Sequence, residues 1–476
     1  MAGRIPRRRR SAISRSMLWV IVAVVVVVVA VGGVYAYMVT SRPSAPSAIV
    51  VGWVTPVTGS LAPFGSIDPW VASYVQNYIN QNMGGIYISQ YGRKIPIEII
   101  VKDTQSSPST AATVTQQLIT QYHVNMLVVA HTPAVVPPAA AVAEKYGVPL
   151  IADDCPVSAF IGSEPTGGYH WSYDYFWAFS QTVYAHLQIV NELRNYTNGK
   201  MVIISSADAD AQAYDPLMEK MATAYGYQVV YVQTFPYGTT DFTSAIMAAK
   251  AANATILVGV MIPPDFATLW RQAISLGWHP TVAVIAKAML FPSEPTSMGD
   301  MQSYGIGTEI WWYPTLNYTS PLLGINTLQW TQMYEAKTGN EWSANIGYDI
   351  ALMDEMYNVL SRTPSLDPLA INQTIYTTNL NTIAGTIDYQ NPFPNPQIKQ
   401  LIETYEPDLL QPQNVGHYSL SLVMSGQWVP GGPWGWTLAP VYNAGTGVAT
   451  YPAVPIPVNP ENATLPYTPP YFVPPS

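Results

Sequence analysis

The chain has 476 residues, of which 49% are apolar and only 10% are charged, and its net charge is −9 at pH 7. This length exceeds the size at which one hydrophobic core keeps growing, so at least two packed units are expected. The single cysteine, Cys155, excludes an internal disulfide framework. The acidic balance argues against nucleic acid as a partner.

The N-terminal region joins a basic cluster to an apolar run. Residues 1–16 hold six Arg and no acidic residue, and residues 17–38 form 22 consecutive uncharged positions. At about 1.5 Å per residue this run reaches ~33 Å, so it predicts a transmembrane helix, either an anchor or an uncleaved signal. The Arg cluster predicts a cytoplasmic N-terminus and an extracellular remainder.

Beyond a linker at 39–48, apolar runs of strand length alternate with helix-like stretches. The first series has runs at 49–54, 95–101, 126–130 and 148–152, with helices at 68–82, 109–122 and 133–146. The second has runs at 201–205, 228–232, 255–259 and 282–285, with helices at 214–225, 241–251 and 265–276. Continuous apolar strands are typical of parallel sheets covered on both faces, so two doubly wound α/β lobes are predicted.

Two segments fall outside this alternation. The aromatic stretch 169–179 separates the two series and is a candidate wall between the lobes. From residue 430 to the end, 12 of 47 residues are Pro, which predicts an extended tail at 441–476 in place of a third core. A stalk, a spacer and a strap around one lobe are all open for this tail.

Five sequons follow the apolar run and suit a glycosylated exterior. The predicted acceptors are Asn195, Asn253, Asn317, Asn372 and Asn462.

The loop after the first predicted strand is rich in hydroxyl and small residues. Gly59 and Gly65 permit close backbone approach, and Thr55 supplies a hydroxyl at the strand end, where open parallel sheets bind ligands. Five residues separate the two glycines and no Lys follows, so this is not a phosphate loop. No GxGxxG after a strand, HExxH or GxSxG motif occurs. The chain is therefore predicted to have no catalytic residue, no metal site and no cofactor.

The order of motifs resembles the extracytoplasmic solute-binding proteins of ABC importers, in the type I, branched-chain amino acid and amide-binding (leucine-binding-protein-like) family. The resemblance covers about residues 49–428 and rests on VGWVTPVTGSLAPFG (51–65) and on residues 80–111, 139–151, 239–260 and 345–360. It implies two lobes joined by a three-crossover hinge, which close on a small ligand for delivery to a membrane permease with cytoplasmic ATPases.

The resemblance also implies the lobe boundaries. Lobe 1 is expected at 49–168 and 290–384, and lobe 2 at 169–289 and 385–440. The crossovers are expected near 169–174, 285–291 and 384–388.

Family positions nominate the ligand-binding residues. Phe64 stands where an aromatic packs on the ligand, and Thr132 keeps one of the usual hydroxyls after the third strand. Asp153 and Asp154 replace small hydroxyl residues, and Lys287 replaces an acid; both changes oppose an α-amino acid. The full predicted set is Thr55, Phe64, Thr132, Asp153, Asp154, Trp171, Asp208, Asp210, Met261 and Lys287.

Several ligands fit this pattern. A sugar would use Asp153, Asp154 and Asp208 as hydrogen-bond acceptors and stack on Trp171 or Phe64. A cation would use the same carboxylates, and a metal ion would need His131, Asp153 and Cys155 to converge. Alternatively, Asp153 and Asp154 cap a helix, and Trp171, Trp311 and Trp312 pack in the core or between the lobes.

The sequence therefore predicts a membrane-anchored receptor that captures a small polar solute, such as an amino acid or amide, for an ABC permease. A sensor ectodomain on the same fold is the first alternative, although 16 cytoplasmic residues are too few for a signalling domain. A surface-assembly subunit is the second, because residues 10–27 faintly resemble the processed pilin-like leaders of some archaeal solute-binding proteins. An enzyme is the least favoured reading.

Overall fold

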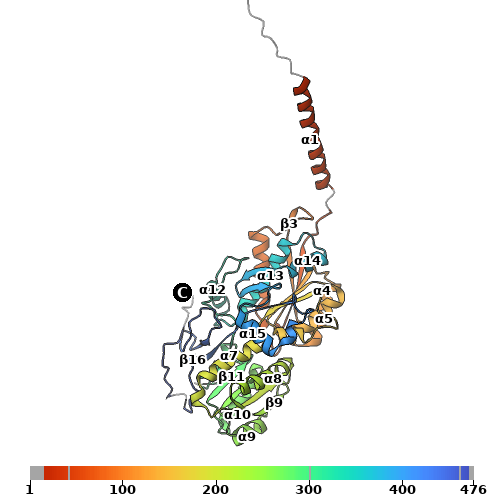
Figure 1. Ribbon diagram of the computed structural model, residues 1–476. Helices are drawn as coiled ribbons and strands as arrows, with labels where there is room; N and C mark the ends of the chain where they lie inside the picture. Colours follow the sequence, from red (N-terminus) through yellow and green to blue (C-terminus); the bar gives the residue numbers. More distant parts are fainter. Residues whose placement is uncertain (1–14, 41–42, 300–301, 460–461, 471–476) are drawn as a thin grey trace, which may run out of the picture.

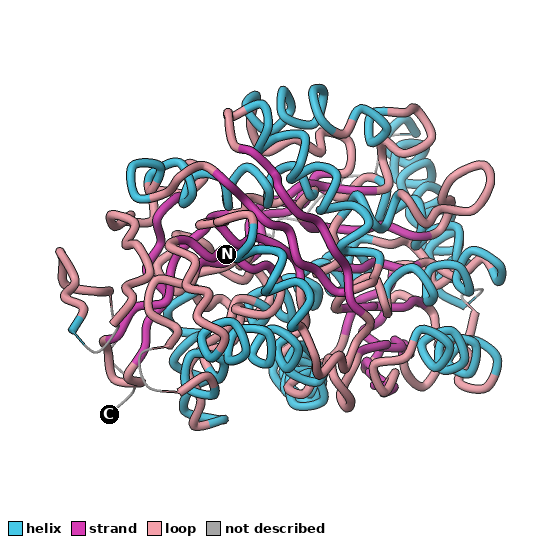
Figure 2. The backbone as a smooth tube through the Cα atoms, turned by 90° about the horizontal axis from the view of Figure 1, so that it is seen from below, coloured by secondary structure: helices cyan, strands magenta, loops and turns pink. Residues whose placement is uncertain are grey.

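The computed structural model describes residues 15–40, 43–299, 302–459 and 462–470, so most of the predicted cytoplasmic segment 1–16 lies outside the described residues. Two α/β lobes lie one above the other, and α1 (Arg15–Thr40) projects away from them (Figure 1). Helices lie on both sides of the strands (Figure 2).

The sheet of the first lobe is six-stranded and parallel, with the order β15-β7-β6-β5-β1-β4. Its central strands β5 and β6 are buried at every position, as expected for a sheet covered on both faces. The strands are β1 (Ile49–Thr55), β4 (Ile97–Asp103), β5 (Met126–Ala130), β6 (Leu150–Asp153), β7 (Ser172–Phe176) and β15 (Tyr418–Leu420). Its main helices are α3 (Asp68–Asn77), α4 (Pro108–Thr120), α5 (Val136–Tyr146) and α13 (Asn345–Arg362).

The second lobe has a seven-stranded sheet with the order β17-β16-β12-β11-β10-β8-β9. Five strands are parallel, namely β8 (Lys200–Ser206), β9 (Gln228–Phe235), β10 (Ile256–Val260), β11 (Val282–Ala286) and β12 (Gly307–Ile310). The antiparallel hairpin β16 (Met424–Pro430) and β17 (Trp436–Tyr442) forms one edge. Its helices are α7 (Phe179–Glu192), α8 (Ala209–Ala224), α9 (Thr243–Ala251) and α10 (Pro263–Ser275).

Shorter elements complete the two lobes. They are α2 (Ala62–Gly65), a π-helical turn (Tyr78–Asn82), β2 (Ile86–Ile88), β3 (Arg93–Ile95), α6 (Val157–Ile161), α11 (Ser293–Ser297), α12 (Thr327–Thr338), α14 (Pro368–Tyr376), β13 (Asn379–Thr382), β14 (Gly385–Asp388), α15 (Pro396–Tyr405) and two 3-10 turns (Arg194–Tyr196, Pro407–Leu410).

The chain passes between the lobes at three places, but each lies later than the predicted one. The crossings follow β7, β12 and β15, so they fall after residues 176, 310 and 420 in place of 169–174, 285–291 and 384–388. The predicted boundaries at 169, 290 and 385 shift accordingly. These three strands are short and contain Asp174, Glu309 and Ser419, so they lack the apolar run that marks the other parallel strands.

Helix α13 is the central helix of the first lobe. Its first 12 residues are all buried, and it belongs to the segment that returns from the second lobe. At Gly347 a Cβ atom would lie 2.3 Å from the Trp312 ring, so only glycine lets the helix reach this indole. The Trp312 Nε1 atom donates to the Ile383 carbonyl at 2.9 Å, and Trp312 is therefore a core residue.

The Pro-rich tail forms a strap along the second lobe. The Ile456 N–H donates to the Thr281 carbonyl at 2.8 Å, and the Val454 N–H donates to Gln427 Oε1 at 2.8 Å. Val454 also packs against Tyr304. Of the three alternatives for 441–476, the described part favours the strap, while residues 460–461 and 471–476 lie outside it.

The predicted transmembrane segment 17–38 lies within α1. The side chains of residues 19–31 within it are exposed. In the described part of the chain, no helix combines the length and apolar character needed to cross a membrane. The span stays a prediction from the sequence.

Four of the predicted glycosylation acceptors are exposed, namely Asn195, Asn253, Asn317 and Asn462. Asn372 is half-buried and donates from Nδ2 to the His170 carbonyl at 3.0 Å.

Buried carboxyl groups predict a stability that rises on acidification. Burial raises the pKa of Glu341, Asp354 and Glu355 to about 8 each. Between pH ~4 and ~8 these groups are protonated when folded and ionised when unfolded, so the free energy of unfolding falls as the pH rises through this window. Urea unfolding at pH 5, 6, 7 and 8 measures the slope.

The matched variant is Glu355→Gln, which keeps an acceptor for the Tyr389 hydroxyl, now 2.9 Å from Glu355 Oε1. In this variant, the free energy of unfolding should fall less steeply with pH, by about 1.4 kcal/mol per pH unit. A wild-type stability that increases from pH 5 to pH 8 contradicts this account.

Candidate ligand-binding site

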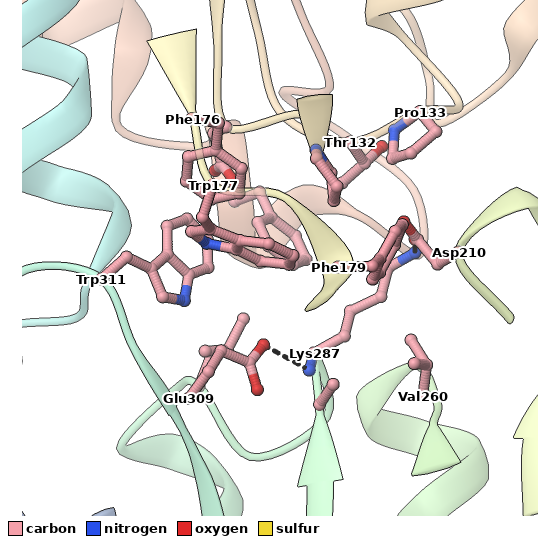
Figure 3. A pocket seen from close by; sticks show the side chains of 15 residues that line it. Thr132, Pro133, Phe176, Trp177, Phe179, Asp210, Val260, Lys287, Glu309 and Trp311 are labelled. Carbon is pink, nitrogen blue, oxygen red and sulfur yellow. Dashed lines mark hydrogen bonds and ion pairs between the residues drawn. The ribbon is translucent and has the colours of Figure 1, made fainter. Parts of the chain in front are cut away.

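A cavity lies between the lobes, where the carboxyl ends of the two sheets face each other (Figure 3). It is lined by Phe64, Thr132, Pro133, Asp154, Pro156, Phe176, Trp177, Phe179, Asp210, Val260, Ala286, Lys287, Leu290, Glu309 and Trp311. Crevices at strand ends are where open α/β sheets bind ligands.

Several lining residues stand directly after a strand. Thr132 follows β5, Asp154 follows β6 and Trp177 follows β7 in the first lobe, while Lys287 follows β11 and Trp311 follows β12 in the second. The central buried strands hold few polar side chains, so polar and aromatic positions gather at these ends. Both lobes therefore contribute to one cavity.

Five of the fifteen lining residues are aromatic. Phe176 meets Trp311 edge to face with ring centroids 4.8 Å apart, and Trp177 meets Phe179 in the same way at 5.6 Å. Phe64 packs edge to face on Phe291 at 4.8 Å. Rings provide large apolar area with few rotors to order, which suits a site that closes on a flat or branched apolar group.

The unpaired polar atoms of the wall are donors. Among the described residues that line the cavity, the buried atoms without a hydrogen-bond partner are Thr132 Oγ1, Trp177 Nε1 and Trp311 Nε1. The two indole N–H groups can only donate, and the hydroxyl can donate or accept. The wall thus favours a ligand that offers acceptor oxygens.

The carboxylates of the wall already have partners. Asp154 Oδ2 lies 2.6 Å from His131 Nδ1, and Asp210 Oδ2 lies 2.6 Å from Lys287 Nζ. Glu309 Oε1 accepts from the Lys287 backbone N–H at 3.0 Å, the dashed line of Figure 3. They are less available to a ligand than the composition of the loops suggests.

Lys287 is the centre of a buried ion-pair group. Its ammonium also lies 3.3 Å from Asp208 and 3.4 Å from the Tyr237 hydroxyl. Burial lowers the pKa of Lys287, but the charges of Asp210 and Asp208 outweigh this and raise it well above its ordinary value. Burial raises the pKa of Asp210 to about 6, partly offset by Lys287, so the pair is ionised at pH 7.

A second buried group lies behind the wall in the first lobe. His131 follows β5, and its Nε2 atom lies 3.2 Å from Asp68 and 3.3 Å from Asp349. His131 (φ 74°), Thr132 (φ 73°) and Asp154 (φ 52°) all adopt the left-handed region, which is strained for residues with a Cβ and clusters at functional sites.

Five of the predicted ligand-binding residues line the cavity: Phe64, Thr132, Asp154, Asp210 and Lys287. Asp208 reaches it only through Lys287.

Four predicted residues do not line the cavity. Thr55 is buried and donates its hydroxyl to Asp68, and Asp153 and Met261 are buried behind the wall. Trp171 lies outside the cavity against Gly147, because it precedes β7 and stands at the opposite end of that strand.

Four aromatic residues of the wall are not among the predicted ligand-binding residues. Phe176, Trp177 and Phe179 belong to the stretch 169–179, which was recognised as a candidate wall but not assigned residue by residue. Trp311 lines the cavity as well, although its sequence context favoured the core. The signal available was the density of rings between the two series of strands.

Comparison with known proteins agrees with this geometry. Residues 48–397 match a family described as periplasmic binding protein. No curated protein sequence matches the chain.

Solved structures share the fold at low identity. A leucine-binding protein from Thermotoga maritima is 16% identical with a TM-score of 0.64, over 83% of this chain and 99% of that one. The substrate-binding protein of a branched-chain amino acid transporter from Streptococcus pneumoniae, in complex with isoleucine, is 17% identical with the same TM-score and coverage. A solute-binding protein from Rhodopseudomonas palustris, in complex with 3,4-dihydroxybenzoic acid, is 15% identical with a TM-score of 0.63, over 87% and 99%.

The ion-pair group predicts that removing the cation alone destabilises the protein more than removing the cation together with one carboxylate. Lys287→Met leaves the buried Asp210 carboxylate and the partly buried Asp208 carboxylate without their cation, and should lower the free energy of unfolding by about 3–5 kcal/mol at pH 7. The double variant Lys287→Met/Asp210→Asn removes the nearer charge too and should lose clearly less. Urea unfolding of both variants tests this, and equal losses would contradict the assignment of an ionised pair.

Proposed function

Because the chain belongs to the periplasmic binding protein family, the leucine-binding-protein-like solute-binding proteins of ABC transporters, we propose that it captures a small solute between its lobes for an ABC permease. Members of this family are typically not enzymes. The observation that carries the proposal is the cavity to which the strand ends of both sheets contribute. A ligand held by both lobes stabilises the closed form, since only differential contacts shift such an equilibrium.

The wall favours a small aromatic acid as the solute. Aromatic side chains from both lobes would enclose the ring, and the unpaired donors Thr132 Oγ1, Trp177 Nε1 and Trp311 Nε1 would meet the carboxylate. Hydrogen bonds to a charged acceptor contribute about 1.5–3 kcal/mol each. The dihydroxybenzoate complex of the Rhodopseudomonas palustris protein supports this ligand class.

An α-amino acid is the second candidate, favoured by the isoleucine complex of the Streptococcus pneumoniae protein. Its ammonium group needs a free acceptor. The lining carboxylates Asp154, Asp210 and Glu309 are engaged with His131, Lys287 and the Lys287 backbone, so this candidate is disfavoured.

Anchoring at the outer face of the cell membrane is part of the proposal. The support is the uncharged run 17–38, preceded by six Arg, together with the position of α1 away from both lobes (Figure 1). An anchored receptor stays near its permease.

Calorimetry on the purified full chain tests the ligand class. We expect 3,4-dihydroxybenzoate or 4-hydroxybenzoate to bind more tightly than isoleucine. Trp311→Phe keeps a ring but removes the indole donor, and should weaken aromatic-acid binding by about tenfold or more.

The control is Trp171→Phe, an equivalent exchange at a partly exposed position outside the cavity, which should leave affinity unchanged. Tighter binding of isoleucine, or wild-type affinity in Trp311→Phe, would contradict the aromatic-acid assignment.

A further inference from the structure

We propose that the first lobe holds a divalent metal ion of the zinc class, bound by Asp68, His131 and Asp349 behind the wall of the cavity. The three residues come from α3, from the loop after β5 and from α13. Each is fully buried, and one ligand atom from each lies within 4.8 Å of the others. The site is independent of the ligand proposed for the cavity.

The separations between these atoms suit a tetrahedral ion. His131 Nε2 lies 3.2 Å from Asp68 Oδ2 and 3.3 Å from Asp349 Oδ1. Zinc bonds of about 2.0–2.1 Å at tetrahedral angles place neighbouring ligand atoms about 3.3 Å apart. The histidine and both carboxylates therefore need no large rearrangement to share one ion.

The histidine is oriented as metal-bound histidines are. Its Nδ1 atom lies 2.6 Å from Asp154 Oδ2, so the Nδ1–H group donates to this carboxylate and the Nε2 lone pair is left for a metal. Despite the short distances, Nε2 makes no hydrogen bond of acceptable angle, and both carboxylate oxygens of Asp349 are also unpaired and buried. The Thr55 hydroxyl donates to Asp68, as groups around metal sites hold a ligating carboxylate.

The cluster of carboxylates around His131 also favours a bound cation. Asp68, Asp154 and Asp349 contact one imidazole, and Asp153 ends the neighbouring strand. Among the ion pairs of the described residues, none joins these four carboxylates to a lysine or arginine. Buried charges without partners are strongly unfavourable, and a dication offsets two of them.

The donor set selects the class of ion. One imidazole nitrogen with two carboxylate oxygens suits Zn²⁺, whereas Ca²⁺ and Mg²⁺ prefer oxygen alone. The alternative set His131, Asp153 and Cys155 does not assemble, because among the described residues the three-residue group with ligand atoms close enough to share an ion is Asp68, His131 and Asp349. His131 is common to both sets, and its two partners come from helices.

Such an ion would support the cavity without entering it. Asp154 lines the cavity and holds His131, whose ring centroid lies 6.1 Å from that of Phe64. An ion bound to His131 would also tie α13 to α3, which belong to chain segments separated by the five parallel strands of the second lobe.

Metal analysis of the full chain tests the site. After dialysis against Zn²⁺ and removal of free ion, we expect about one Zn²⁺ per wild-type chain and a Tm that falls on treatment with a strong chelator. His131→Gln and Asp349→Asn should each lose the bound Zn²⁺. The matched control is His186→Gln, because His186 is also fully buried and lies 3.1 Å from Glu309, but in the second lobe; it should keep the ion.

Co²⁺ in the wild-type chain gives a readout that needs no variant to fold. Replacement of Zn²⁺ by Co²⁺ should produce the visible absorption of a four-coordinate site, and added Zn²⁺ should abolish it. A wild-type chain that binds neither ion stoichiometrically and keeps its Tm in chelator overturns the proposal, as does full Zn²⁺ occupancy in His131→Gln.

Discussion

The whole structure depends on one constraint: a parallel sheet covered by helices on both faces has no solvated face, so its polar chemistry is confined to the strand ends. The two sheets present these ends to each other. As a result, the ion-pair group around Lys287, the carboxylates around His131 and the aromatic wall all lie within one layer between the lobes. Residues far apart in sequence meet there because every βα loop of both sheets leads to it.

The same constraint decides how much of the fold and of the candidate site can be predicted from the sequence. Strands such as β5 and β10 are uninterrupted apolar runs, and their positions and fold class follow from the sequence almost to the residue. The sequence also locates residues that follow such strands, among them Thr132 after β5 and Lys287 after β11. Strands β7 and β12 carry Asp174 and Glu309 inside, so they and the rings that follow them escaped detection. Asp68 and Asp349 reach the site from helices, and no local pattern connects them to His131.

The fold also shows where the few charged residues of the chain lie. At least 13 of the 29 acidic residues are buried, so much of the scarce charge is inside the protein. Burial raises the pKa of Glu341 to about 8, and Asp354 and Glu355 behave in the same way, so the formal net charge overstates the charge at pH 7. A surface built mainly from uncharged polar side chains fits this distribution, because few charges remain to be placed there.

The strap adds a geometric consequence. Its contacts at Thr281, Gln427 and Tyr304 all belong to the second lobe, whereas β1, which opens the folded part of the chain, belongs to the first. The strand β1 and the strap, which lie toward opposite ends of the chain, are thus fastened to opposite halves of a hinged body. A donor dye near residue 45 and an acceptor dye near residue 465 would be attached to different lobes. The efficiency of energy transfer between them would therefore change each time the lobes open or close.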